Sequence, residues 1–165
     1  MKLQDSLYHI VADKTVENGH QFDVCLNANH VIYQSHFPGE PITPGVCIMQ
    51  IAVELLANLL QVSVQLVCAK NIKFMHIISP NEVPEVTYLF QKITQEAGRF
   101  QVQVTVTAPS APLAPSVPEF VESLCKASAE SNLFELCRAT AKDMKGPESP
   151  PITYAKLTLI CQTNP

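Results

Sequence analysis

An apolar stretch that follows a proline- and glycine-rich loop constrains the fold of this chain more than any other feature. Three prolines and Gly39 between positions 38 and 44 exclude a helix or a central strand from the loop. We expect Thr43 to be the N-cap of a helix and Pro44 its first residue, where the missing N–H costs nothing. From there to about Gln61, most of the helix circumference is apolar. The stretch therefore predicts one long buried helix.

A polar stripe interrupts the apolar surface of this helix. Gln50, Glu54 and Asn58 recur every four residues, so they lie on one side of the helix. Polar side chains on a buried helix need hydrogen-bond partners or a cavity. The stripe therefore indicates either a site or a contact with another part of the protein.

Segments with the pattern of β-strands lie before and after the helix. They are rich in Val, Ile, Thr, Phe and Tyr, and several alternate apolar and polar residues with a period of two. The predicted strands are residues 8–14, 21–27, 64–78, 85–94, 100–107 and 154–162. This order predicts an α+β fold in which one antiparallel sheet wraps around one long buried helix.

The stretch 109–151 separates the last two predicted strands. Seven of the thirteen prolines stand at its two ends, which leaves its middle open to helices. A structureless loop of this length is uncommon in a compact domain. Ser116 with Glu119 matches a capping box, and Asn132 with Glu135 marks a second helix start. We therefore expect a helical insertion at about 109–151 before the last strand, within a single domain that spans residues 1–165.

The composition argues against several classes of function. The net charge is −4 and basic residues form no run, so nucleic acid and membrane are not expected as partners. The first residues are polar, unlike a signal peptide, and the longest apolar stretch, 46–60, is too short to span a bilayer. The six cysteines show neither C-x-x-C nor zinc-finger spacing. We expect a cytoplasmic protein with reduced, mostly buried cysteines and without a metal or cofactor.

Two groups at the ends of the proline-rich loop form a candidate site. His36 begins the loop, which holds the imidazole in place, and Gly45 stands where the helix starts. The first N–H groups of a helix carry partial positive charge and suit a carbonyl oxygen that becomes negative. A fixed imidazole beside such an oxyanion site is what proton abstraction next to a thioester carbonyl requires.

A family resemblance rests on residues 36–46, which read HFPGEPITPGV. This segment, running into a hydrophobic helix, resembles the active-site motif of the hotdog-fold 3-hydroxyacyl-[acyl-carrier-protein] dehydratases. Lys73-Phe74 and the later Pro80-Asn81-Glu82 are similar to a strand and turn of those enzymes. The resemblance covers about residues 5–108 and the closing strand. It implies a hotdog fold and a homodimer or larger assembly, with each site shared between two subunits.

The resemblance also implies roles for single residues. His36 would act on the α-proton of the substrate, and the N–H of Gly45 would bind the thioester carbonyl. The substrate-binding residues implied by the motif are Phe37, Gly39, Pro44, Gly45 and Val46. In the family, an acidic residue fourteen positions after the His, from the other subunit, protonates the 3-hydroxyl. That position holds Gln50 here, which can donate a hydrogen bond but not a proton at neutral pH.

Glu54 stands one turn after Gln50, where the family usually has Gln. Three hypotheses stay open for the catalytic set of His36, Gln50 and Glu54. In the first, a dehydratase acts on an acyl thioester of acyl-carrier protein or coenzyme A, and Glu54 transfers the proton directly or through a water bridged by Gln50. In the second, the protein is a thioesterase with Glu54 as nucleophile or general base. In the third, it binds acyl thioesters without chemistry. A separate interpretation of Glu54 is a solvated or hydrogen-bonded helix residue with no part in chemistry.

Two further surfaces have alternative interpretations. The insertion would pack on its own sheet or on a second copy, or else cover the acyl tunnel or dock a partner. Because carrier proteins are acidic, basic residues near the tunnel mouth are candidate contacts. These are Lys70, Lys73, Lys92 and Arg99.

Overall fold

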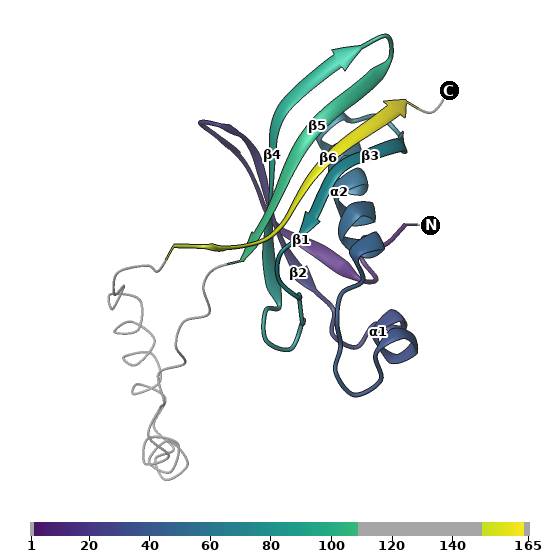
Figure 1. The fold of residues 1–165 in the computed structure, drawn as a ribbon, viewed down its shortest axis with the longest axis vertical. Helices are drawn as coiled ribbons and strands as arrows, with labels where there is room; N and C mark the ends of the chain where they lie inside the picture. Colours follow the sequence, from purple (N-terminus) through teal and green to yellow (C-terminus); the bar gives the residue numbers. More distant parts are fainter. Residues whose placement is uncertain (1, 109–149, 164–165) are drawn as a thin grey trace, which may run out of the picture. The chain divides into compact units, whose positions relative to one another are not determined.

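A computed structural model describes residues 2–108 and 150–163 (Figure 1). The described elements are β1 (Tyr8–Val16), β2 (Gly19–Leu26), α1 (Val31–His36), α2 (Gly45–Leu60), β3 (Val64–Phe74), β4 (Glu85–Glu96), β5 (Arg99–Ala108) and β6 (Ile152–Thr163). The insertion predicted at 109–151 lies, except for its last two residues, outside the described part of the chain. Its helices and the single domain over residues 1–165 therefore stay predictions.

The six strands form one antiparallel sheet in the order β1-β2-β4-β5-β6-β3. The last strand in the sequence, β6, pairs on one side with β5 and on the other with β3. This leaves β1 and β3 at the two edges of the sheet. Two helices and an antiparallel sheet make an α+β arrangement, consistent with the hotdog-like fold predicted from the sequence.

The period-two pattern of the strands places apolar side chains on the face toward α2. In β5, Phe100, Val102 and Val104 are buried, while the residues between them are exposed or half-buried. The tight turn between β4 and β5 has Ala97 and Gly98 at φ +46° and +75°. Two positive φ values are typical of a type I′ hairpin turn, which matches the twist of the paired strands.

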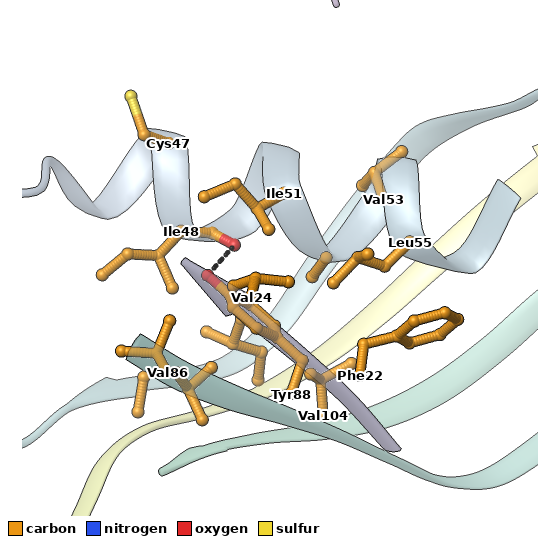
Figure 2. Packing of buried hydrophobic residues seen from close by; sticks show 14 of the residues in the cluster. Phe22, Val24, Cys47, Ile48, Ile51, Val53, Leu55, Val86, Tyr88 and Val104 are labelled. Carbon is orange, nitrogen blue, oxygen red and sulfur yellow. Dashed lines mark hydrogen bonds between the residues drawn. The ribbon is translucent and has the colours of Figure 1, made fainter. Parts of the chain in front are cut away.

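Helix α2 lies along one face of the sheet (Figure 1). Figure 2 shows Ile48 and Leu55 directed toward Val24 and Tyr88 of the sheet, and all four side chains are buried. The Tyr88 hydroxyl donates a hydrogen bond to the carbonyl oxygen of Ile48, 3.4 Å away. These contacts attach α2 to β2 and β4 of the sheet.

The start of α2 differs from the prediction by one residue. Pro44 is the N-cap, with φ −62° and ψ 143°, and makes no side-chain capping bond. Thr43 is buried, and its hydroxyl lies 3.1 Å from the hydroxyl of Tyr33. Because Tyr33 takes this hydroxyl, Thr43 anchors the loop instead of capping the helix. The helix ends at Leu60, followed by Gln61 in the left-handed conformation with φ +55°.

The short helix α1 was not predicted from the sequence. Its N-cap is His30, whose Nδ1 accepts a hydrogen bond from the N–H of Ile32 at 3.2 Å. Tyr33 is the buried residue of this helix and reaches across to Thr43. His36 is therefore the last helical residue before the loop rather than a residue inside it.

Two further sequence expectations concern the described residues. No helix in these ranges is long and apolar enough to cross a membrane. The four cysteines of the described ranges are free thiols, of which Cys47 and Cys161 are buried. Cys25 is half-buried and Cys68 is exposed on the edge strand β3, so two of the four described cysteines are buried.

Candidate active site

His36 is presented to solvent at the end of α1. The N–H of Phe37 donates to the carbonyl of Tyr33 and closes the helix. The imidazole of His36 lies against the ring of Phe37, with 4.7 Å between centroids and 30° between the planes. Gly39 has φ +97°, which L side chains rarely adopt, so the loop needs glycine here although space is open around it. The loop therefore holds an exposed imidazole beside an aromatic ring.

The loop leads from His36 to the first turn of α2. The carbonyl of Pro44 accepts from the N–H groups of Cys47 and Ile48, at 2.9 and 3.1 Å. The N–H groups of Gly45 and Val46, which precede them, have no acceptor within the helix because the first turn of a helix offers none. Val46 is 67% exposed, so this end of the helix is open to a ligand. The first turn can therefore donate hydrogen bonds to a developing oxyanion.

Phe74 lies against Gly45 and explains why this position is glycine. A Cβ at Gly45 would come within 2.8 Å of Cζ of the Phe74 ring. Phe74 is the last residue of β3 and is 46% exposed. The aromatic ring therefore forms one apolar side of the surroundings of the Gly45 amide.

Glu54 is the centre of a hydrogen-bond network. Its Oε1 accepts from the N–H of Leu3 at 2.8 Å and from Nε2 of Gln50 at 3.0 Å. Its Oε2 accepts from the N–H of Gln4 at 2.9 Å and from the hydroxyl of Tyr8 at 3.2 Å. Burial, and then the Glu54 carboxylate, raise the pKa of Tyr8 well above its usual value, so this hydroxyl stays a donor. The polar stripe thus has partners in the N-terminal segment.

A groove of about 410 Å³ runs along the same side of α2. Its lining includes Gln50, Glu54 and Asn58 of the stripe, together with Lys2 and Gln4 of the N-terminal segment. Asn58 Nδ2 donates to Oε1 of Gln4 at 3.1 Å, which adds a second tie between the stripe and this segment. The stripe predicted from the sequence therefore forms the wall of a polar groove.

The structure brings the predicted site residues together in two groups. Phe37, Gly39, Pro44 and Val46 lie with His36 and Gly45 in the loop and the first helical turn. Gln50 and Glu54 line the groove, whose lining includes neither His36 nor Gly45. Gln50 stands five positions after Gly45, a rise of about 7.5 Å along a helix. A substrate that reaches both groups of the same subunit would have to extend along α2.

Three residues that contact Glu54 were not predicted from the sequence. Leu3, Gln4 and Tyr8 contact Glu54 from positions 46 to 51 residues away, and nothing local in the sequence marks them. The polar stripe of α2 indicated that hydrogen-bond partners or a cavity exist, but it did not indicate which residues the partners are. Within the described residues there is no group of three His, Cys, Asp or Glu side chains arranged to hold a metal ion.

A family model matches a large part of the chain. The ApeI-like family model, described as ApeI dehydratase, matches residues 12–112. The match includes the loop from His36 to Gly45 and the polar stripe of α2, and it covers more than half of the chain. No curated protein matches the chain. By its sequence and its hotdog-like architecture, the chain belongs to the ApeI-like family of dehydratases.

Proposed function

We propose that this protein removes water from 3-hydroxyacyl thioesters and produces trans-2-enoyl thioesters. The observation that carries the proposal is the short loop that joins His36, at the end of α1, to the first turn of α2 at Gly45. The two ends of this loop supply a base and an oxyanion donor, the groups that such an elimination needs. Membership of the ApeI-like family supports a dehydratase reaction.

In the proposed reaction, the N–H of Gly45 donates to the thioester carbonyl oxygen and stabilises its negative charge. His36 takes a proton from C2, the electrons of that C–H bond form the C2–C3 double bond, and the C3–O bond breaks. The leaving hydroxyl takes up one proton and departs as water. Because the side chain of Gln50 has no acidic proton, we assign the return of the proton to His36 and hydrogen bonding of the 3-hydroxyl to Gln50. The four donors around Glu54 argue against a proton relay through that carboxylate.

We propose a homodimer in which His36 of one subunit faces Gln50 of the other. Support comes from β3, an edge strand of eleven residues whose side chains are nearly all exposed. Leu66, Val67 and Ile72 are 39%, 44% and 38% exposed on this strand. An unpaired edge with exposed apolar side chains is typical of a surface that pairs with another chain. Pairing of this kind would bring a second copy next to α2.

Either acyl-carrier protein or coenzyme A remains a proposed carrier of the acyl group. Strands β3, β5 and β6 contain no Asp or Glu, yet they hold Lys70, Lys73, Arg99 and Lys156. Lys73 stands directly opposite Lys156 in the β3–β6 pair. This facing pair of cations favours a carrier that is acidic or carries phosphate groups, although Arg99 stands opposite Glu96 of β4. A cytoplasmic location, expected from the sequence, also stays a prediction.

A non-catalytic acyl-thioester-binding subunit is the second candidate function. Gln50 favours it, because the family's acidic residue is missing at this position. A thioesterase has less support, since it would need Glu54 as nucleophile or general base and this carboxylate already accepts four hydrogen bonds. The three functions differ in product: enoyl thioester, no product, or free thiol.

The test is dehydration of 3-hydroxybutyryl-coenzyme A and hydration of crotonyl-coenzyme A by the purified protein, followed by the ultraviolet absorbance of the enoyl thioester. We expect turnover in the wild type, its loss in His36→Ala, and its retention in His9→Ala, a control at an exposed histidine of β1. A silent wild type that gains turnover with Gln50→Glu would replace the dehydratase proposal with the binding role. Thiol release without an enoyl product would support the thioesterase.

A further inference from the structure

The carboxylate of Glu54 has no position left for a substrate. A carboxylate offers about four lone-pair positions on its two oxygens. Leu3, Gln4, Tyr8 and Gln50 each donate one hydrogen bond to it, at distances from 2.8 to 3.2 Å. Glu54 therefore acts as an acceptor at the centre of a network.

The bond from Gln50 to Glu54 fixes the orientation of the Gln50 amide. A carboxylate only accepts, so it can face the Nε2 end of the amide but not the Oε1 end. A flipped Gln50 amide would place its Oε1 against Oε1 of Glu54, and two acceptors repel each other. The carbonyl oxygen Oε1 of Gln50 is therefore at the end of the amide that points away from Glu54.

The charge of Glu54 strengthens this arrangement. The two ion pairs found among the described residues join Lys14 to Asp23 and His20 to Asp13, so the donors to Glu54 in this part of the chain are all neutral. An N–H group that donates to a carboxylate polarises the rest of its amide. The carbonyl of Gln50 consequently becomes a better acceptor for a hydroxyl group.

The N-terminal segment holds Glu54 itself in place. The main-chain amides of Leu3 and Gln4 are part of a segment anchored by the side chain of Leu3, which is 3% exposed. The Gln4 side chain is tied to Asn58, one turn further along α2. Main-chain donors and the buried Leu3 side chain leave the Glu54 carboxylate little freedom to rotate. The orientation of Gln50 therefore depends on the N-terminal segment, which is distant from it in the sequence.

We propose that Glu54 is a positioning residue that acts through Gln50, and that residues 2–8 belong to the site because they hold Glu54. The proposal rests on the dehydratase function. Gln50 Oε1 would accept the hydrogen of the 3-hydroxyl, which leaves the lone pairs of the hydroxyl oxygen for the proton carried by His36. No proton passes through Glu54 or Gln50 in this scheme.

The test is a double-mutant cycle with Glu54→Gln, Gln50→Ala and the double variant, measured as kcat and KM for 3-hydroxybutyryl-coenzyme A. Loss of one charge-assisted hydrogen bond that orients a reacting group lowers kcat by about tenfold, with little change in KM. If Glu54 acts through Gln50, Glu54→Gln has no further effect once Gln50 is alanine. Glu96→Gln, the same chemical change at an exposed carboxylate of β4, serves as the matched control.

A second readout does not depend on turnover. The side-chain amide of Gln50, observed by ¹H–¹⁵N NMR, should shift in Glu54→Gln and stay unchanged in Glu96→Gln. An unchanged Gln50 signal, or equal effects of Glu54→Gln with and without Gln50, would overturn the positioning role while the dehydratase proposal stands. A wild type without turnover whose Gln50 signal still responds to Glu54→Gln would overturn both the dehydratase and the catalytic role of this contact, and leave the contact as a structural tie.

Discussion

Replacement of Glu54 by alanine should destabilise the fold by removing the acceptor of four hydrogen bonds. Tyr8 is 1% exposed, so its hydroxyl would lose its partner at a buried position. An unsatisfied buried donor of this kind costs about 1–3 kcal/mol. The amides of Leu3 and Gln4 are only partly buried, so water would replace much of their two bonds, at a loss of about 0.5 kcal/mol each. Together these losses amount to about 3 kcal/mol in the free energy of unfolding.

The assay is urea unfolding followed by circular dichroism, since the chain has no tryptophan to report by fluorescence. Protein concentration must be held fixed, because a dimer would make the apparent stability depend on it. Glu54→Gln keeps one acceptor oxygen and should cost about 1 kcal/mol. In a double-mutant cycle, Tyr8→Phe should lose most of its effect when Glu54 is already alanine.

The matched control is Glu96→Gln, which changes an exposed carboxylate and should alter stability by less than about 0.5 kcal/mol. If Glu54→Ala unfolds at the same urea concentration as this control, the network contributes nothing and the reasoning from its four distances is refuted. Additive effects of Glu54→Ala and Tyr8→Phe would refute the assignment of the largest share to the Tyr8 hydroxyl.

Three further predictions follow from single contacts. Gly45→Ala should lower the free energy of unfolding by about 1 kcal/mol and reduce kcat/KM, because its Cβ would come within 2.8 Å of the Phe74 ring. Adding Phe74→Ala should restore the lost stability. A Gly45→Ala variant as stable as the wild type would contradict the close packing. Ile72→Lys on the edge strand β3 should convert the dimer to monomers, as measured by light scattering. Ile93 of β4 is equally exposed, and Ile93→Lys should leave the dimer intact. If the Ile72→Lys variant is still a dimer, pairing through β3 is excluded. Burial raises the pKa of Asp23, but the hydrogen bonds that its carboxylate accepts from neighbouring side chains together lower it by more. The pKa of Asp23 therefore lies below its usual value. A carboxylate with a lowered pKa stabilises the fold at pH values above its unfolded pKa of about 3.9, and this contribution is lost as the pH falls through its folded pKa. The difference in stability between the wild type and Asp23→Asn should therefore shrink in acid. A difference that does not change with pH would contradict the lowered pKa.

Much of the fold could be predicted because its elements have strong local patterns. The period-two alternation of apolar and polar residues identified several strands, among them β5 at residues 100–107. The loop of the candidate site was recognisable because prolines and glycines exclude regular structure. His36 and Gly45, at its two ends, were therefore predictable as a pair.

The short helix α1 and the start of α2 were missed for a shared reason. Both depend on the contact between the hydroxyls of Tyr33 and Thr43, ten residues apart, which buries Tyr33 and takes the hydroxyl that would have capped α2. A six-residue helix has too little periodicity to be detected, and α1 is held in part by tertiary packing of its buried Tyr33. Sequence patterns report local preference, and here a tertiary contact overrides it.

The sequence by itself determined where the strands and the long helix lie, that one side of α2 is polar, and that His36 and Gly45 are joined by a short loop rich in proline and glycine. Only the tertiary structure decided that β6 enters between β5 and β3, and that Glu54 is held by Leu3, Gln4 and Tyr8. The physical reason is range: periodicity and turn residues act over a few positions, whereas hydrogen-bond partners are chosen by whichever donors the folded chain brings to an acceptor. For Glu54 those donors come from about fifty residues away, so nothing local in the sequence identified the N-terminal segment that this carboxylate holds.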